Sequence, residues 1–212
     1  SIMHGQASHI NSSYFGHFNY GGGMSVDVDL TNTTAKPQIL NCTFRNNSAK
    51  LGGGAMSIFT TLSSHINPLV DNCKFYDNSS ILGRGGAIYQ EGGVYTGEDY
   101  IISNCLFERN FAKTTGGALH IKNIPNRQFF LNCDFIENFA IADGGGVYLK
   151  QDLYILSLQQ TTFLGCNFIQ NKSTNTNNGT QGIGGLHFSN GSQTSANGIE
   201  YVIIIKDSNF IG

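Results

Sequence analysis

Five cysteines recur along the chain at nearly constant intervals, with successive differences in residue number of 31, 32, 28 and 33; they are Cys42, Cys73, Cys105, Cys133 and Cys166. Zinc sites usually bring cysteines together as close C-x-x-C pairs, and no such pair is present. The spacing favours a column of buried thiols that act as small hydrophobic side chains. Disulfides between neighbouring turns of the chain are the alternative, and the odd count would leave one cysteine over.

Each cysteine belongs to a longer repeated pattern, N-C-x-F-x-x-N followed by G-G-A, an apolar residue, any residue and an apolar residue. The pattern is clearest at 104–110 and 116–121, and a degenerate copy is present at 11–14 and 21–26. Cysteine and phenylalanine lie two residues apart, as do the apolar residues after the glycines. This period of two predicts strands rather than amphipathic helices.

A unit of about 30 residues with short strands and glycine turns cannot bury an apolar face alone, so copies must stack. The sequence therefore predicts an all-β, right-handed parallel β-helix (a solenoid) with about six rungs of roughly 30 residues. We expect residues 1–212 to form a single β-helix segment. Because both ends of the chain resemble interior parts of the repeat, we expect it to be cut from a longer repeat protein.

Stacked copies should place equivalent side chains in ladders about 4.8 Å apart. Besides the cysteines, we expect a buried phenylalanine ladder of Phe44, Phe75, Phe107, Phe135 and Phe168. The asparagine three residues later should form an inward turn ladder whose amides bond one another and the turn backbone. Its members are Asn47, Asn78, Asn110, Asn138 and Asn171.

Between the apolar residues of the second strand lies a column of aromatic rings: Tyr89, His120, Tyr148 and His187. Alternation predicts that this column faces outward, where it could stack on sugar rings or pack against a neighbouring rod. Ordinary half-exposed strand residues are the plainer interpretation. His120 and His187 lie two rungs apart, which argues against a zinc site, and we expect no metal and no cofactor.

The composition excludes several kinds of partner. The net charge is −2 and charged residues make up 12% of the chain, so no electrostatic surface for nucleic acid or an anionic membrane is indicated. No apolar run approaches the roughly 20 residues that cross a bilayer. We therefore expect neither nucleic-acid binding nor membrane insertion by this segment.

Eight N-glycosylation sequons indicate a secreted or surface-exposed chain. Six are good candidates for glycans: Asn11, Asn32, Asn41, Asn46, Asn178 and Asn190. Asn78 and Asn171 also belong to the predicted inward ladder. They are poorer candidates, because a buried amide cannot carry a glycan.

The paired motifs F-x-x-N and G-G-A-[ILV], recurring in order over nearly the whole chain, resemble the repeats of chlamydial polymorphic outer-membrane proteins. Similar repeats occur in surface proteins of ciliates and other protists. The resemblance implies a pectin-lyase-like right-handed β-helix displayed outside a cell, with an adhesive or structural role. The C-terminal barrel of the bacterial family is not present in this sequence.

Enzymes on this fold cleave acidic polysaccharides with clustered carboxylates or an oxygen-rich Ca²⁺ site. Here the acidic residues are scattered, and the one close pair, Asp27 and Asp29, falls on a single strand. We expect a non-enzymatic scaffold segment of an extracellular fibre or cell-surface coat, whose partners are N-glycans and further copies or repeats of itself. A surface adhesin that binds glycan or protein through the aromatic column is the alternative, and a polysaccharide lyase or glycosidase is the least favoured.

Overall fold

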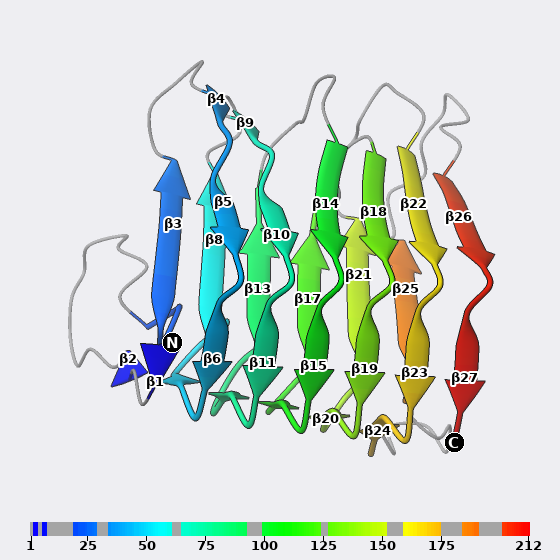
Figure 1. Ribbon diagram of the computed structural model, residues 1–212. Helices are drawn as coiled ribbons and strands as arrows, with labels where there is room; N and C mark the ends of the chain where they lie inside the picture. Colours follow the sequence, from blue (N-terminus) through cyan, green and yellow to red (C-terminus); the bar gives the residue numbers. More distant parts are fainter. Residues whose placement is uncertain are drawn as a thin grey trace.

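The computed structural model describes residues 2–3, 6–7, 19–28, 34–60, 65–92, 99–123, 127–151, 159–174, 184–190 and 201–212. Every regular element in these ranges is a β-strand, and nearly all of the strands belong to four parallel sheets that run side by side along one axis (Figure 1). The predicted all-β parallel solenoid is confirmed. Its right-handedness and the number of rungs stay predictions.

We number the sheets in the order in which the chain passes through them. Sheet 1 contains β5 (Gln38–Leu40), β10 (Leu69–Asp71), β14 (Asp99–Ser103), β18 (Arg127–Leu131), β22 (Gln159–Leu164) and β26 (Tyr201–Lys206). Sheet 2 contains β1 (Ile2–Met3), β6 (Thr43–Arg45), β11 (Lys74–Tyr76), β15 (Leu106–Glu108), β19 (Asp134–Ile136), β23 (Asn167–Ile169) and β27 (Asn209–Ile211).

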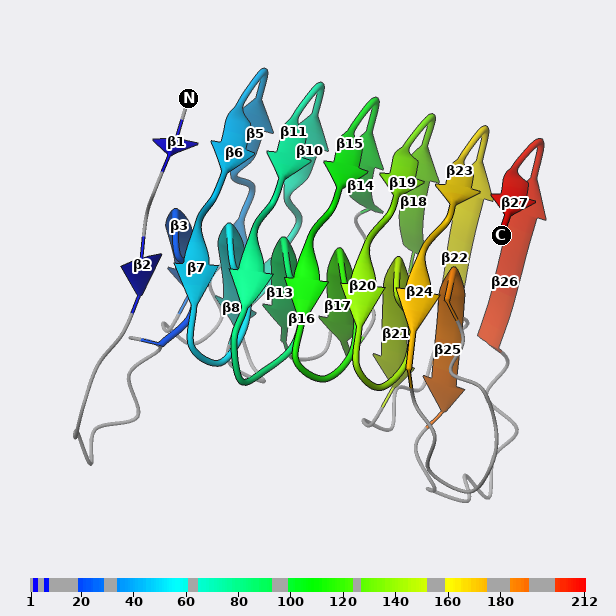
Figure 2. The same cartoon turned by 90° about the horizontal axis from the view of Figure 1, so that it is seen from below.

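Sheet 3 contains the two-residue strands β2 (Gln6–Ala7), β7 (Ser48–Ala49), β12 (Ser79–Ser80), β16 (Phe111–Ala112), β20 (Phe139–Ala140) and β24 (Lys172–Ser173). Sheet 4 contains β3 (Met24–Val28), β8 (Met56–Thr60), β13 (Ile88–Glu91), β17 (Leu119–Lys122), β21 (Val147–Gln151) and β25 (Leu186–Asn190). A separate short pair joins β4 (Thr34–Ala35) to β9 (His65–Ile66). Figure 2 shows how each coil passes from sheet 2 through sheet 3 into sheet 4.

Two sharp corners in each coil depend on single residues with positive φ. The residue before each cysteine turns the chain from sheet 1 into sheet 2; it is an asparagine in four coils, with φ of 54° at Asn41 and 51° at Asn104, and Gly165 with φ of 65° before Cys166. The residue after each sheet 2 strand makes the second corner; these are Asn46, Asp77, Arg109, Glu137 and Gln170, with φ between 50° and 55°. Asparagine adopts this left-handed conformation readily, whereas longer side chains do so at a cost of about 1 kcal/mol or more.

The glycine pairs make the turn that leads into sheet 4. A positive φ is found at Gly21, Gly53, Gly85, Gly116 and Gly144, with 60° at Gly85. The second glycine of the pair lies against the next coil, because a Cβ on Gly86 would come 2.0 Å from the carbonyl oxygen of Gly117. The pair is therefore required by the left-handed turn and by close backbone approach together.

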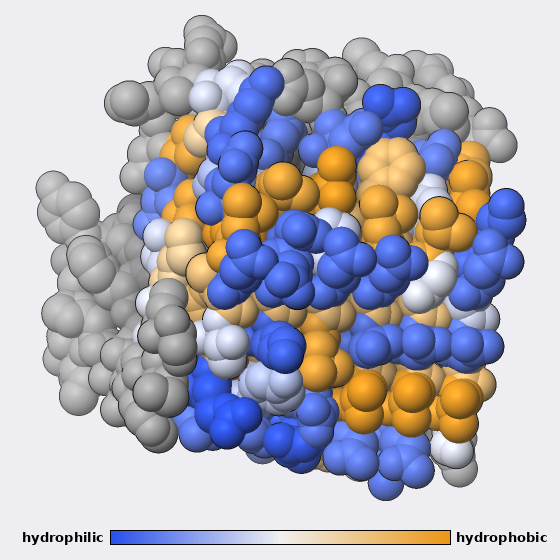
Figure 3. Space-filling view, viewed as in Figure 1, coloured by the Kyte–Doolittle hydropathy of each residue, from blue (hydrophilic) through white to orange (hydrophobic). Residues whose placement is uncertain are grey.

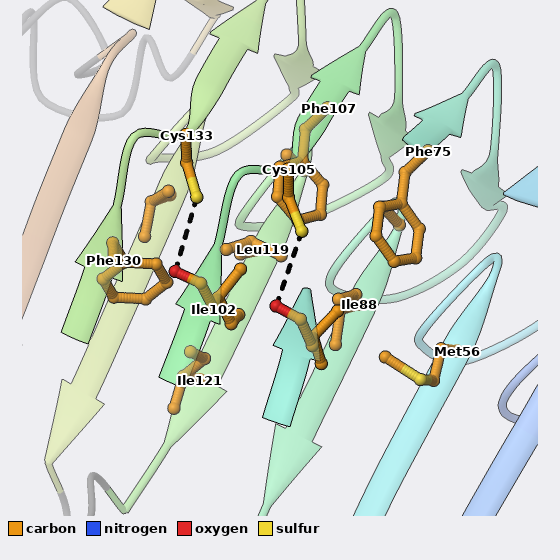
Figure 4. Packing of buried hydrophobic residues seen from close by; sticks show 14 of the residues in the cluster. Met56, Phe75, Ile88, Ile102, Cys105, Phe107, Leu119, Ile121, Phe130 and Cys133 are labelled. Atoms are coloured by element: carbon orange, nitrogen blue, oxygen red, sulfur yellow. Dashed lines mark hydrogen bonds between the residues drawn. The ribbon is translucent and has the colours of Figure 1, made fainter. Parts of the chain in front are cut away.

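The interior of the coil is apolar and ordered in columns. The predicted phenylalanines pair in register from β6 to β23 and are buried, with neighbouring ring centroids 4.7–5.0 Å apart. The apolar residues of sheet 4 and the cysteines pack around them, as the close view of the core in Figure 4 shows. This one continuous cluster is the hydrophobic core of the solenoid.

Beside the phenylalanines runs a ladder of buried asparagines at the second corner. From the second member onward, each Oδ1 accepts two hydrogen bonds from the asparagine of the preceding coil; that of Asn110 accepts from the backbone nitrogen (3.1 Å) and from Nδ2 (3.0 Å) of Asn78. In the three interior members Nδ2 donates both of its protons; that of Asn110 donates to Phe75 O at 3.0 Å and to Asn138 Oδ1 at 2.9 Å. We call this set (Asn47, Asn78, Asn110, Asn138 and Asn171) the asparagine ladder.

We predict that Asn110→Ala destabilises the solenoid strongly. The substitution removes four buried hydrogen bonds that the Asn110 side chain makes to the neighbouring coils, and each group left under-satisfied in the core costs about 1–3 kcal/mol. Because the losses are not additive, we expect the free energy of unfolding in urea to fall by at least about 3 kcal/mol. The matched control is Asn167→Ala, whose side chain bonds Asp134 Oδ1 at 2.7 Å on the partly exposed outer face. Water can replace that bond, so a control loss as large as that of Asn110→Ala would contradict the prediction.

Candidate functional site

The column proposed as a binding stripe forms one continuous stack on the side of sheet 4 that faces away from the core. Tyr89, His120, Tyr148 and His187 are direct register partners on β13, β17, β21 and β25. Neighbouring ring centroids lie 4.9–5.3 Å apart, and Tyr20 extends the stack beyond Tyr89. The structure therefore brings all four residues together.

The expectation that this column is exposed is wrong. Tyr89 and His120 are each 1% exposed, Tyr148 is 9% exposed, and only His187 at the end of the stack keeps about a fifth of its side chain in solvent. At two points in the described residues, the segment before a glycine pair lies over the outer side of sheet 4. Thr115 Oγ1 bonds His120 Nδ1 at 2.7 Å, and the backbone of Gly52 lies against the rings of Tyr20 and Tyr89. The rings are buried between this cover and sheet 4, with their faces turned toward one another.

A charged group, Glu91, lies beside the stack at the hydroxyl of Tyr89. Tyr89 donates its phenolic proton to Glu91, and Glu91 also accepts from Lys122 on the next strand. Burial, and after it the Glu91 charge, raise the pKa of Tyr89. Burial alone would raise the pKa of Glu91, but the hydrogen bonds from Lys122 and Tyr89 lower it below its ordinary value. The arrangement holds a carboxylate and an ammonium group as a partly buried pair, which is a structural role.

His120 is a buried imidazole whose Nε2 has no hydrogen-bond partner. Burial lowers its pKa well below 6.5, and the positive charges of Arg84, Lys150 and Lys122 lower it further. The ring is therefore neutral in the folded protein at neutral pH. Its surroundings provide stacking partners on both faces and one hydroxyl, which suits a packed core side chain.

The five cysteines stand one above another at the start of sheet 2, and all five are free. Cys42 is partly exposed, and the other four are buried. Each buried thiol donates to carbonyl oxygens, as Cys133 does to Ile102 O at 3.5 Å (Figure 4). The neighbouring Cys105 sulfur and burial raise the pKa of both the Cys73 and the Cys133 thiols, which keeps them protonated. The column thus acts as a set of small hydrophobic side chains.

The sequons fall into three groups. Asn41 and Asn46 are exposed at the two corners of one coil, whereas Asn78 is fully buried and Asn171 is half-buried within the asparagine ladder. Asn11, Asn32 and Asn178 lie outside the described residues. Asn190 is the last residue of β25, and its side chain is not described.

Acidic side chains do not gather into a site. Asp27 lies on β3 and accepts a hydrogen bond from Ser25 at 3.0 Å, and its predicted neighbour Asp29 is outside the described residues. Within the ranges that the structure describes, no three His, Cys, Asp or Glu side chains lie close enough together to bind a metal ion. In those same ranges no helix is long and apolar enough to cross a membrane.

Sequence reasoning missed a second aromatic pair, on the outer side of sheet 3. Phe111 and Phe139 are register partners and half-exposed, with ring centroids 5.8 Å apart. Beside Phe139 lies a hollow of about 260 Å³, which Glu137, Gln170 and Lys172 also line. The signal was present in the repeat, since both phenylalanines occupy the outward position directly after the ladder asparagine.

No family model, curated protein sequence or solved structure matches this chain.

We predict that only Cys42 reacts quickly with the thiol reagent DTNB in the folded protein. The other four thiols are buried in the core, so the reagent cannot reach their sulfur atoms while the chain is folded. The native chain should release about one equivalent rapidly and five after unfolding without reductant, and Cys42→Ser should remove the fast phase. Fewer than five thiols in the unfolded, unreduced chain would instead show disulfides.

We predict that His120 makes the fold sensitive to acid. Its folded-state pKa is depressed, so its contribution to stability is complete above pH 6.5 and is lost as the pH falls below that value, where only the unfolded chain binds the proton. One such group lowers the free energy of unfolding by up to about 1.4 kcal/mol per pH unit. His120→Phe keeps a stacked ring without the titration, so its stability should depend less on pH below 6.5 in urea unfolding. Equal slopes for the two proteins would contradict this assignment.

Proposed function

We propose that this chain is a non-enzymatic structural segment of an extended β-solenoid. The observation that carries the proposal is the continuity of its ladders. The phenylalanine and cysteine columns and the asparagine ladder pass from coil to coil in unbroken register. Such an architecture gives a stiff rod whose length grows with each added coil.

The last coil retains the chemistry of an interior coil. β27 pairs with β23, and Phe210 stacks on Phe168 with ring centroids 4.6 Å apart, yet Phe210 is 51% exposed and Ile205 is 47% exposed. An open sheet edge with exposed apolar columns favours pairing with a further strand. In the proposal the first coil of another copy covers this face, because head-to-tail stacking keeps the strands parallel.

We further propose that the rod lies outside a cell, in a fibre or surface coat. The exposed sequons at Asn41 and Asn46 support N-glycosylation there. The resemblance of the repeat to those of chlamydial polymorphic outer-membrane proteins and protist surface proteins supports the same location and a right-handed, pectin-lyase-like winding. Because Tyr89, His120 and Tyr148 are buried, an adhesive role would require another surface.

Electron microscopy of the native assembly tests the proposal. A sheet of seven strands spaced about 4.8 Å apart is roughly 30 Å long. We expect straight rods or filaments clearly longer than this. Isolated particles of about 30 Å in the native material would overturn the structural role.

Two variants of the isolated chain test whether the end face is the contact. Phe210→Asp places a charge on that face, whereas the control Ile81→Asp changes a 46% exposed side chain on a distant coil. If copies associate in sedimentation experiments, Phe210→Asp should weaken the association at least tenfold and Ile81→Asp should leave it within about twofold. Equal effects would rule out end-to-end stacking through β27.

A further inference from the structure

We propose that the hollow beside Phe139 is a binding subsite for one neutral hexopyranose unit of an oligosaccharide. This site is independent of the structural role and lies on a different face from the buried stack of sheet 4. Three observations support it: the shape of the hollow, the chemistry of its lining, and a fold that does not require the side chains found there.

The hollow lies against the free face of an aromatic ring. Along the outward column of sheet 3, Phe111 covers one face of Phe139, with an interplanar angle of 22°. The next position on the other side is Lys172, the register partner of Phe139 on β24. Because Phe139 and Lys172 both line the hollow, the hollow occupies the space on the uncovered side of the ring. Its volume of about 260 Å³ is below the range of about 300–1,000 Å³ typical of drug-sized ligands, so it suits a single ring.

The lining matches the two-sided character of a pyranose. The face of Phe139 offers an apolar platform for the C–H groups of the sugar. Around it, Glu137 supplies a carboxylate acceptor, Lys172 an ammonium donor and Gln170 an amide that can do both. One negative and one positive group balance each other, which favours a neutral sugar over a uronate or a phosphate.

The fold itself does not require these residues. In the same outward column the other coils carry Ser48 and Ser79, so a small polar side chain is compatible with the sheet. Two half-exposed phenylalanines there leave apolar surface in water with no core to join. Glu137 and Gln170 hold left-handed corners at φ of 52° and 50°, as Asp77 and Arg109 do on other coils, so the fold fixes the backbone there and leaves the side chain open to variation.

The subsite is therefore shallow and lies on the side of the rod, where a saccharide chain can extend beyond it in either direction. A single shallow subsite gives weak binding, so we expect dissociation constants for short oligosaccharides near the millimolar range.

The test uses a matched pair of substitutions in one column. Wild type, Phe139→Ser and Phe111→Ser should first be shown to be folded by circular dichroism and thermal unfolding, which the serines at 48 and 79 lead us to expect. Each is then screened against immobilised neutral gluco-, manno-, galacto- and chito-oligosaccharides, with uronate oligomers and inorganic phosphate as comparison ligands. Saturation-transfer NMR then measures affinity for any saccharide retained.

We expect at least one neutral series to bind wild type, with binding at least tenfold weaker in Phe139→Ser and within about threefold of wild type in Phe111→Ser. Glu137→Gln should weaken binding by a smaller factor. The proposal is overturned if no neutral saccharide binds at millimolar concentration, if Phe139→Ser binds as wild type does, or if only uronate or phosphate binds. Rod length in electron microscopy should be unchanged in Phe139→Ser, which separates failure of this subsite from failure of the structural role.

Discussion

The asparagine ladder is the interaction on which the rest of the solenoid depends. A side-chain amide offers two donors and an acceptor, and here both donors and the acceptor are used inside a core that excludes water. A shift of one coil against the next by a single residue would break every one of these bonds and would also turn the phenylalanines outward. A shift of two residues would keep the phenylalanines inward but would still break the ladder, so the polar ladder gives the stack its unique register.

The register in turn explains the corners. Once the asparagine amide must reach the neighbouring coil, the residue before it has to adopt a left-handed conformation, whatever its type. Arg109 accepts this position and forms a bidentate pair with Asp77 of the preceding coil, with Nε 2.8 Å from Oδ1. The pair raises the pKa of Arg109, but both side chains are largely exposed, so the pair adds little stability. The buried asparagine therefore decides the backbone conformation of the corner residue, even where that residue type prefers a negative φ.

Much of the fold could be predicted from the sequence because its period is visible in single residues. The cysteine and the phenylalanine of a repeat, such as Cys105 and Phe107, lie two residues apart in every copy that has the cysteine. That spacing is enough to identify strands and their inward faces. The burial of His120 could not be predicted in the same way. The alternation of the strand correctly predicts that His120 points away from the core. Thr115, however, lies over the ring, and no residue within the strand indicates that contact. Likewise, no local propensity indicates a left-handed corner at Glu137.

The same design explains how a repetitive rod can carry individual sites. Inward columns are constrained by their neighbours on both sides, so they repeat closely. The outward column of sheet 4 is covered, whereas Figure 3 shows the outward columns of sheets 1 and 2 as rows of polar and apolar side chains that vary along the axis. The proposed saccharide subsite at Phe139 is one such variation. An earlier coil carries Ser48, a small polar side chain, in the same column. Structure and recognition can thus be separated on the two sides of each strand.

Hydrogen exchange measured by NMR at the backbone amides of Asn78, Asn110 and Asn138 tests the central claim most directly. Each of these amides donates to the side-chain oxygen of the next ladder asparagine and to no backbone carbonyl of a regular sheet. If the asparagine ladder holds the coils in register, these three amides should be protected as strongly as those of the buried phenylalanines in sheet 2. Exchange as fast as that of exposed turn residues would contradict the account, because the ladder would then be opening without the fold.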